Sequence, residues 1–156
     1  MRISVLAIGA RMPGWVEAGV QTYQKRFPRQ LDFQIKALAS PLRSASADSA
    51  TRRKQEAEAL HKAVPPGAHV VALDEQGALW TSAELAQQLE RWQTAAMPVA
   101  LLIGGADGLD VSCRRQADQV WSLSPLTLPH ALVRVVVAEQ LYRAWTLLQG
   151  HPYHRN

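Results

Sequence analysis

The chain has 156 residues, of which 47% are hydrophobic, a formal net charge of +4 and a single cysteine, Cys113. This length predicts one domain, residues 1–156, with a sizeable core, and the lone cysteine excludes an intrachain disulfide. Since no apolar run reaches about 18 residues and no secretory signal is recognised, we expect a cytoplasmic protein without a membrane span. Most of the positive charge comes from arginine, which suits a polyanionic partner but does not identify one.

Hydrophobic periodicity predicts strands that alternate with helices. A buried strand at residues 3–8 precedes a helix that begins at Pro13 and ends near residue 27, and an edge strand follows at residues 31–38. Residues 39–49 are rich in Ala, Ser and Pro and predict a loop before a charged helix at residues 50–64. The next strand, residues 69–73, is expected to end at Asp74 before a turn at residues 75–77.

The second half of the chain continues this alternation. Thr81 and Glu84 have the spacing of a capping box, which predicts a helix that ends near residue 94. Strands are predicted at residues 99–103 and 119–123, and a final helix at residues 131–148. This order predicts an α/β fold with right-handed crossovers, in which helices cover both faces of a mainly parallel sheet.

Three of the predicted strand ends carry residues suited to ligand binding. Ligands bind at the carboxyl ends of strands in such sheets, which places residues 73–74, 103–105 and 123–128 on one rim. The last of these segments alternates leucines with hydroxyl-bearing residues and prolines, so it offers an apolar surface and backbone hydrogen-bonding groups without a fixed charge. It suits an adenine and a ribose better than a phosphate. An ordinary strand-to-helix connection remains the alternative.

Several common chemistries lack their motifs. The first strand-to-helix turn has no Gly-x-Gly-x-x-Gly, and no Gly-Lys-Ser/Thr phosphate loop occurs, which disfavours dinucleotide-binding and P-loop enzymes. His151 and His154 have a ligand-like spacing but no adjacent third ligand, so no metal site is predicted. Cys113 is expected to be a small buried residue, and Ser122 and Ser124 lack the Gly-x-Ser-x-Gly turn of a hydrolase.

The last predicted helix is apolar on nearly every face in its first two turns. Between residues 131 and 138 only Arg134 is polar. Such a helix needs apolar cover on two sides, and the sheet supplies one of them. We expect a partner subunit to supply the other, which predicts a homodimer.

The end of this helix and the tail that follows it carry further candidates. Glu139 and Arg143 lie four residues apart and can face each other, either as a common surface ion pair or as catalytic groups. A chain end often frays, but the composition of this tail favours a function. Tyr153 can stack on a base, Arg155 can bind a phosphate, and His154 can move a proton near neutral pH.

These motifs resemble one known family along the full length of the chain. The matching segments are Val5-x-x-Ile8-Gly9, Tyr23-x-x-Arg26, Leu73-Asp74, Leu101-Leu102-Ile103-Gly104-Gly105, Leu123-Ser124-x-Leu126-Thr127-Leu128-Pro129-His130, Arg134-Val135-x-x-x-Glu139-Gln140-Leu141-Tyr142-Arg143-Ala144 and His151-Pro152-Tyr153-His154-Arg155. The sequence resembles the SPOUT (α/β-knot) methyltransferases, and within them the ribosomal large-subunit methyltransferase H family. At Ala106-Asp107 it departs from the Pro-Glu of some members.

The resemblance implies a C-terminal trefoil knot, S-adenosylmethionine as methyl donor, and a homodimer whose composite site uses both subunits. It implies methylation of N3 of a pseudouridine in 23S rRNA, and we expect the assembled ribosome to be the substrate. The cofactor-binding positions carried over are Leu73, Gly104, Leu123, Ser124, Pro125, Leu126, Thr127 and Leu128.

The resemblance and the residue chemistry together suggest roles for the tail and the last helix. His154 or Glu139 would take the N3 proton, and we prefer His154 because the ordinary histidine pKa lies near working pH. Arg143 or Arg155 would stabilise the anionic ring. Tyr153 and Arg155 have an alternative role, which is to position the RNA.

Two other functions remain open. The first is a non-catalytic RNA-binding assembly factor on a degenerate methyltransferase fold, against which the intact glycines and the intact tail argue. The second is a tRNA-modifying SPOUT enzyme. Such enzymes usually carry an added RNA-binding domain, for which this chain has no room.

Overall fold

The computed structural model describes residues 1–41 and 48–155, so most of the loop predicted at residues 39–49 lies outside the described residues. The elements in chain order are β1 (Arg2–Ile8), α1 (Gly14–Gln24), β2 (Asp32–Leu38), α2 (Ser49–Ala63), β3 (His69–Leu79), α3 (Ser82–Ala95), β4 (Val99–Ile103), α4 (Val111–Gln116), β5 (Gln119–Ser122), α5 (His130–Gln149) and the 3-10 turn η1 (Pro152–Arg155). The predicted alternation of strands and helices is confirmed.

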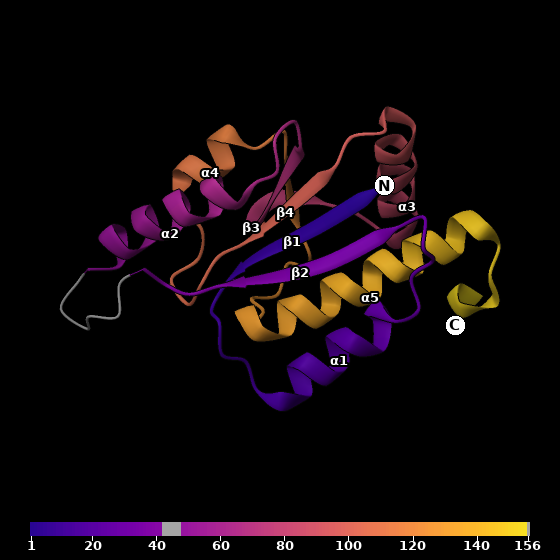
Figure 1. Cartoon of the computed structure of the whole chain (residues 1–156), viewed down its shortest axis with the longest axis horizontal. Coiled ribbons are helices and arrows are strands. Elements are labelled where there is room, and N and C mark those ends of the chain that lie inside the picture. The colour runs from indigo at the N-terminus through magenta and orange to yellow at the C-terminus, as the bar shows by residue number, and fades with distance from the viewer. Residues whose placement is uncertain (42–47, 156) are drawn as a thin grey trace.

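The five strands form one parallel sheet in the order β2-β1-β4-β3-β5 (Figure 1). β4 is buried along its whole length, as expected for a continuous apolar run inside a parallel sheet. β2 alternates polar and apolar residues and lies at the edge, as predicted. Because every strand points the same way, the carboxyl ends of all five lie on one rim.

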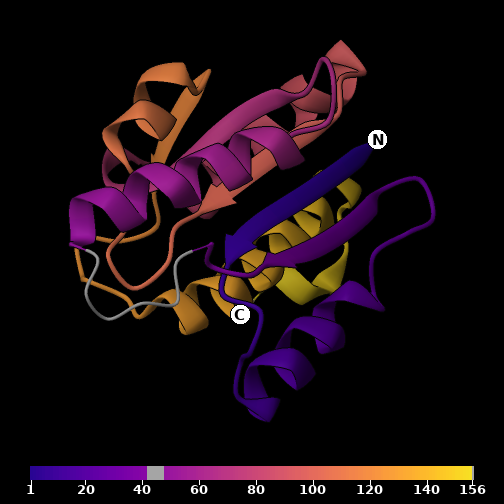
Figure 2. The same ribbon diagram turned by 60° about the vertical axis from the view of Figure 1, so that its left-hand side comes forward.

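Helices cover both faces of this sheet, as predicted (Figure 2). On one face, α3 and α5 bury Leu85, Leu89 and Leu141 against the strands, and α1 packs beside α5. On the other face, α2 and α4 bury Leu60 and Cys113. The Cys113 side chain is fully buried, and burial raises the pKa of its thiol to about 11, so this cysteine is a packing residue.

Strand β3 differs from the prediction that it ends at Asp74. It continues to Leu79 and pairs with β5 across a register shift, so that Leu73 and Ala78 both lie opposite Trp121. Residues 74–77 are therefore a bulge within a strand rather than a terminal turn. Gly77 permits this arrangement, because a Cβ there would lie 2.7 Å from backbone atoms of Trp121.

Local sequence sets the ends of the helices. In the predicted capping box, the Thr81 hydroxyl accepts a hydrogen bond from the Glu84 N–H at 3.1 Å, and the Glu84 carboxylate accepts one from the Thr81 N–H at 2.7 Å. Helix α1 ends at Gln24, earlier than predicted, because the chain turns at Lys25. The short helix α4 was not predicted, since its 6 residues provide too little periodicity.

The bulge in β3 is expected to tolerate no side chain at position 77. Gly77→Ala should lower the free energy of unfolding by about 1–3 kcal/mol, because the new Cβ overlaps the backbone of β5. Urea unfolding of the variant and the wild type measures this difference. Gly14→Ala is the control, since no atom lies within 4 Å of its added Cβ; equal midpoints for the two variants would contradict the prediction.

Candidate active site

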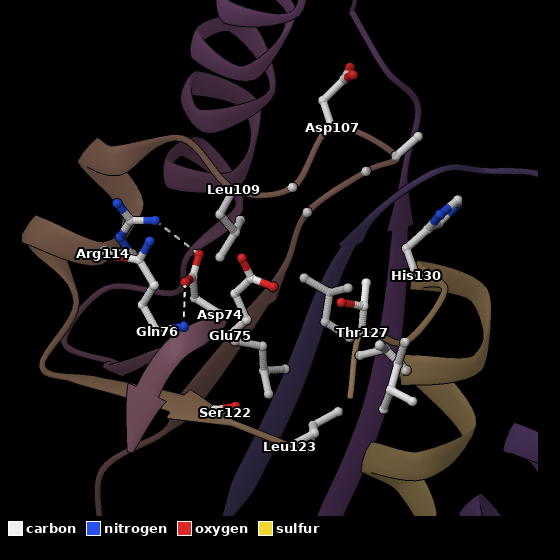
Figure 3. A pocket seen from close by; sticks show the side chains of 18 of the residues that line it. Asp74, Glu75, Gln76, Asp107, Leu109, Arg114, Ser122, Leu123, Thr127 and His130 are labelled. Carbon is white, nitrogen blue, oxygen red and sulfur yellow. Dashed lines mark hydrogen bonds and ion pairs between the residues drawn. The ribbon is translucent and has the colours of Figure 1, made fainter. Parts of the chain in front are cut away.

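A cavity of about 900 Å³ opens at the carboxyl ends of β3, β4 and β5 (Figure 3). This volume is typical of a small-molecule site, and the position is where parallel sheets bind ligands. Its lining includes nearly all the predicted cofactor-binding positions: Leu73, Gly104, Leu123, Ser124, Leu126, Thr127 and Leu128. Pro125 is the exception and is not part of the lining.

The glycine-rich loop between β4 and α4 forms one wall of the cavity. A Cβ at Gly104 would lie 2.5 Å from the carbonyl carbon of Gly108, so the two backbone segments fit only without a side chain. The Gly108 N–H donates to the Gly105 carbonyl at 3.0 Å. Arg52 Nε donates to Asp107 Oδ2 at 2.9 Å, and this guanidinium lowers the pKa of the carboxyl group. An ion pair with Arg52 thus fixes this loop to α2.

The bulge of β3 contributes a second wall. Asp74 Oδ1 accepts a hydrogen bond from the Gln76 N–H at 2.9 Å, and Asp74 Oδ2 pairs with Arg114 Nη1 of α4 at 3.1 Å (Figure 3). Glu75 lies beside this ion pair in the cavity lining. The sequence placed Asp74 on the ligand-binding rim, but it predicted a turn at residues 75–77 and assigned no role to Glu75 and Gln76. Only the pairing of β3 with β5 shows that these two residues also line the cavity.

The segment between β5 and α5 closes the cavity. The Ser122 hydroxyl donates to the Ser124 carbonyl at 3.2 Å, and the Ser124 hydroxyl accepts from the Leu126 N–H at 2.9 Å. These bonds turn the chain and leave the Leu126 side chain 73% exposed. The wall therefore presents apolar and hydroxyl groups without a charge, as its composition predicted.

The predicted catalytic residues gather on α5 and the tail that folds back onto it. Glu139 Oε1 accepts hydrogen bonds from Arg143 Nε at 2.9 Å and from the Tyr153 hydroxyl at 3.0 Å. The Tyr153 ring packs edge-on against Tyr142, with 4.9 Å between centroids. Burial, together with neighbouring Tyr23 and Glu139, raises the pKa of the Tyr153 hydroxyl. The tail is thus docked on α5 rather than frayed.

The last predicted residues lie in η1. Nδ1 of His154 is buried and has no hydrogen-bond partner within residues 1–41 and 48–155, whereas Arg155 is exposed. Neither residue lines the cavity, nor do Glu139, Arg143 and Tyr153. Glu139 lies about two and a half helical turns beyond His130, about 14 Å along the axis. Within one chain, the cavity and the tail cluster (Glu139, Arg143, Tyr153, His154 and Arg155) are therefore separate.

Three polar residues near the rim were not predicted as site residues. His130 lines the cavity from the first turn of α5. Arg134 is 3% exposed, and its Nη2 donates to the carbonyls of Ile8 at 3.0 Å and Gly9 at 2.7 Å, which fixes the turn after β1. Burial lowers the pKa of this guanidinium. Glu56, also buried, lies behind the glycine-rich loop. The signal for Arg134 was its place as the only polar residue in an apolar helical run.

A metal-binding cluster and a membrane-spanning helix are both absent from residues 1–41 and 48–155. No group of three or more His, Cys, Asp or Glu side chains in this part of the chain is placed to hold a metal ion. No helix in it is long and apolar enough to cross a membrane.

Comparison with known proteins identifies the class. A family model described as "Predicted SPOUT methyltransferase" matches residues 1–154. The structure of a probable methylase family protein from Haemophilus influenzae Rd KW20 has the same fold, with a TM-score of 0.59 at 14% sequence identity over 99% of this chain and 70% of that chain. The chain belongs to the SPOUT methyltransferase family.

Two relatives define its place within that class. A protein named "Ribosomal RNA large subunit methyltransferase H" from Hahella chejuensis (strain KCTC 2396) is 54% identical over 99% of this chain and 99% of its own length. A protein of the same name from Pseudomonas aeruginosa (strain UCBPP-PA14) is 48% identical over 99% of this chain and 100% of its own. The chain is therefore a member of the methyltransferase H family, as its motifs indicated.

Docking of the tail is expected to depend on the charge of Glu139. Glu139→Gln removes the anion that pairs with Arg143 and weakens the acceptor for Tyr153, so amide hydrogen exchange at residues 151–155 should accelerate about tenfold. Hydrogen exchange followed by mass spectrometry measures this rate. Glu90→Gln, at an exposed position of α3, is the control. Identical exchange in the two variants would show that Glu139 does not hold the tail.

Proposed function

We propose that this chain is an S-adenosylmethionine-dependent methyltransferase that methylates N3 of a pseudouridine in the 23S rRNA of the assembled ribosome. Full-length relatives named for methylation of large-subunit ribosomal RNA support this substrate. The proposal treats residues 1–156 as a single SPOUT domain with a C-terminal trefoil knot. A cytoplasmic location follows from the ribosome as substrate.

The residues of the cavity fit S-adenosylmethionine. A volume of about 900 Å³ accommodates a nucleoside with an amino-acid arm. Leu73, Leu123 and Leu128 offer an apolar surface to an adenine, and the backbone of the glycine-rich loop and of residues 123–128 offers hydrogen bonds. When bound, this cofactor supplies an electrophilic methyl group.

The tasks left to the protein are to align the base and to remove the proton from N3. The N3–H bond breaks as the N3–methyl bond forms, so the proton needs an acceptor. Glu139 already accepts hydrogen bonds from Arg143 and Tyr153, whereas His154 Nδ1 has no partner in the described part of the chain. We therefore assign the proton to His154, the stabilisation of the anionic ring to Arg143, and the positioning of the RNA to the exposed Arg155.

A homodimer supplies what one chain lacks. The separation of the cavity from the tail cluster within one chain is the observation that carries this part of the proposal. Leu132 and Val136 of α5 are only half-buried, and Trp15 of α1 is 58% exposed, so apolar surface remains for a second copy to cover. The tail of that copy would complete the cavity.

Methyl transfer to ribosomes that lack the modification tests the function directly. Labelled S-adenosylmethionine is supplied, and fragments of the rRNA are analysed by mass spectrometry. The expected product carries one methyl group on a pseudouridine base. Ribosome binding without transfer would favour the non-catalytic assembly factor, and transfer to tRNA would favour the tRNA-modifying enzyme.

Single-turnover rates distinguish the roles of the tail residues. His154→Ala should lower the rate about 10²–10⁴-fold with ribosome affinity unchanged, because the proton acceptor is lost. Arg155→Ala should weaken ribosome binding more than chemistry, since an exposed guanidinium contacts phosphate. Gln149→Ala, at an exposed position at the end of α5, is the control. A nearly full rate for His154→Ala would refute the assignment of the proton to His154, and a nearly full rate for Glu139→Ala as well would exclude both candidates.

Mixed dimers test the composite site. Gly104→Ala disables the cavity and His154→Ala disables the tail, so each variant alone should be inactive. After subunit exchange of equal amounts, about one quarter of the sites should combine an intact cavity with an intact tail from the other subunit. Methyl transfer by the mixture measures this recovery, and wild-type protein taken through the same exchange is the control. An inactive mixture would show that each chain uses its own tail.

A further inference from the structure

Glu56 is a buried acidic residue that the proposed mechanism does not use. It lies in α2 and is 5% exposed. Its Oε1 accepts a hydrogen bond from the Ser40 hydroxyl at 3.1 Å, and its Oε2 has no partner among the residues that the structure describes. Burying a carboxyl group with incomplete hydrogen bonding costs free energy. Stability alone therefore does not account for Glu56.

The carboxyl group of Glu56 lies directly behind the glycine-rich wall of the cavity. A Cβ at Gly105 would lie 3.2 Å from Glu56 Oε1 and 3.4 Å from Oε2, with Ile8 Cγ2 also at 3.2 Å. Gly105 is not among the glycines with positive φ, so its own backbone conformation would accept alanine. A side chain at this position would be tightly packed, and Glu56 or Ile8 would have to move by a few tenths of an ångström to admit it.

Helix α2 contacts the glycine-rich loop at a second point. Arg52, one turn before Glu56 on the same side of the helix, pairs with Asp107 at 2.9 Å. The loop is thus held at Gly105 by packing and at Asp107 by charge. Gly104, which precedes both contacts, lines the cavity. The shape of this wall consequently depends on α2.

We propose that Glu56 is a positioning residue for cofactor binding. Its carboxyl group, held by Ser40 and packed against Gly105, keeps residues 104–108 in the conformation in which Gly104 lines the cavity. The residue is not part of the cavity lining and acts through the loop. This inference rests on the proposed function, because it concerns the same cofactor cavity.

The surroundings of Glu56 raise the pKa of its carboxyl group. Burial is the largest cause of this rise, and the negative charge of Asp107 adds to it. The hydrogen bond from Ser40 and the positive charges of Arg52 and Arg53 act in the opposite direction and lower the pKa. Glutamine has the same shape and can accept the same hydrogen bond from Ser40. Glu56→Gln is therefore the conservative variant that should rescue cofactor binding, whereas Glu56→Ala leaves the loop unsupported.

Calorimetric titration with S-adenosylmethionine tests the role of Glu56 in the folded protein. Glu56→Ala should weaken binding about tenfold and raise KM for the cofactor by a similar factor, with kcat at saturation changed less than about threefold. Glu56→Gln should stay within about threefold of wild type. Glu58→Ala removes an exposed glutamate of the same helix and should bind as wild type does.

A double-mutant cycle with Gly105 identifies the contact through which Glu56 acts. Gly105→Ala brings a Cβ against the carboxyl group and should weaken cofactor binding about tenfold in the wild-type background. In the Glu56→Ala background the carboxyl group is gone and only Ile8 Cγ2 stays 3.2 Å from the added Cβ, so the same change should cost less than about threefold. Equal costs in both backgrounds would overturn the proposal, because the two residues would then act independently.

The outcomes separate this inference from the proposed function. If the wild-type protein does not bind S-adenosylmethionine, the proposed function fails, and this inference fails with it. If the wild type binds and Glu56→Ala binds equally well, only the role of Glu56 is overturned. If Glu56→Ala is too unstable to titrate, Glu56→Gln and Gly105→Ala still test the proposal. Glu56→Gln must keep its affinity for S-adenosylmethionine and Gly105→Ala must lose affinity; any other result overturns the role of Glu56.

Discussion

Close approach of backbone to backbone at the carboxyl ends of the central strands is the constraint on which the site depends. Gly77 lets the bulge of β3 lie against β5, and Gly104 lets the loop after β4 lie against Gly108. Any side chain at either position would separate segments that now touch. On one side, these backbone segments pack tightly against their neighbours. On the other side, they line the cavity at the carboxyl ends of the strands.

The arginines of this chain serve the fold as well as its charge. Arg52 and Arg114 hold two walls of the cavity through Asp107 and Asp74. Arg134 holds the turn after β1 through backbone carbonyls, and Arg143 pairs with Glu139 beside the tail. Some of the arginines that suggested a polyanionic partner therefore stabilise the fold instead, because a planar guanidinium can hold a loop through two hydrogen bonds.

Helix α5 contributes residues both to the cavity and to the tail cluster, so its length fixes the distance between them. His130 and Val133 in the first turn of α5 line the cavity, while Glu139, about two and a half turns after His130, anchors the tail. A helix cannot shorten this separation by bending locally. The proposed homodimer resolves it by symmetry, since a second copy presents its own tail to the first cavity.

The sequence by itself determined the alternation of elements, the capping box at Thr81, the pairing of Glu139 with Arg143 and most of the predicted positions that line the cavity, because these follow from periodicity, local spacing and family motifs. Only the tertiary structure decided that β3 continues past Asp74, that Pro125 lies outside the lining, and that Glu56 lies against the glycine-rich loop. Each of these depends on which distant backbone segments become neighbours, such as β3 with β5 or α2 with residues 104–108, and local patterns carry no information about such contacts.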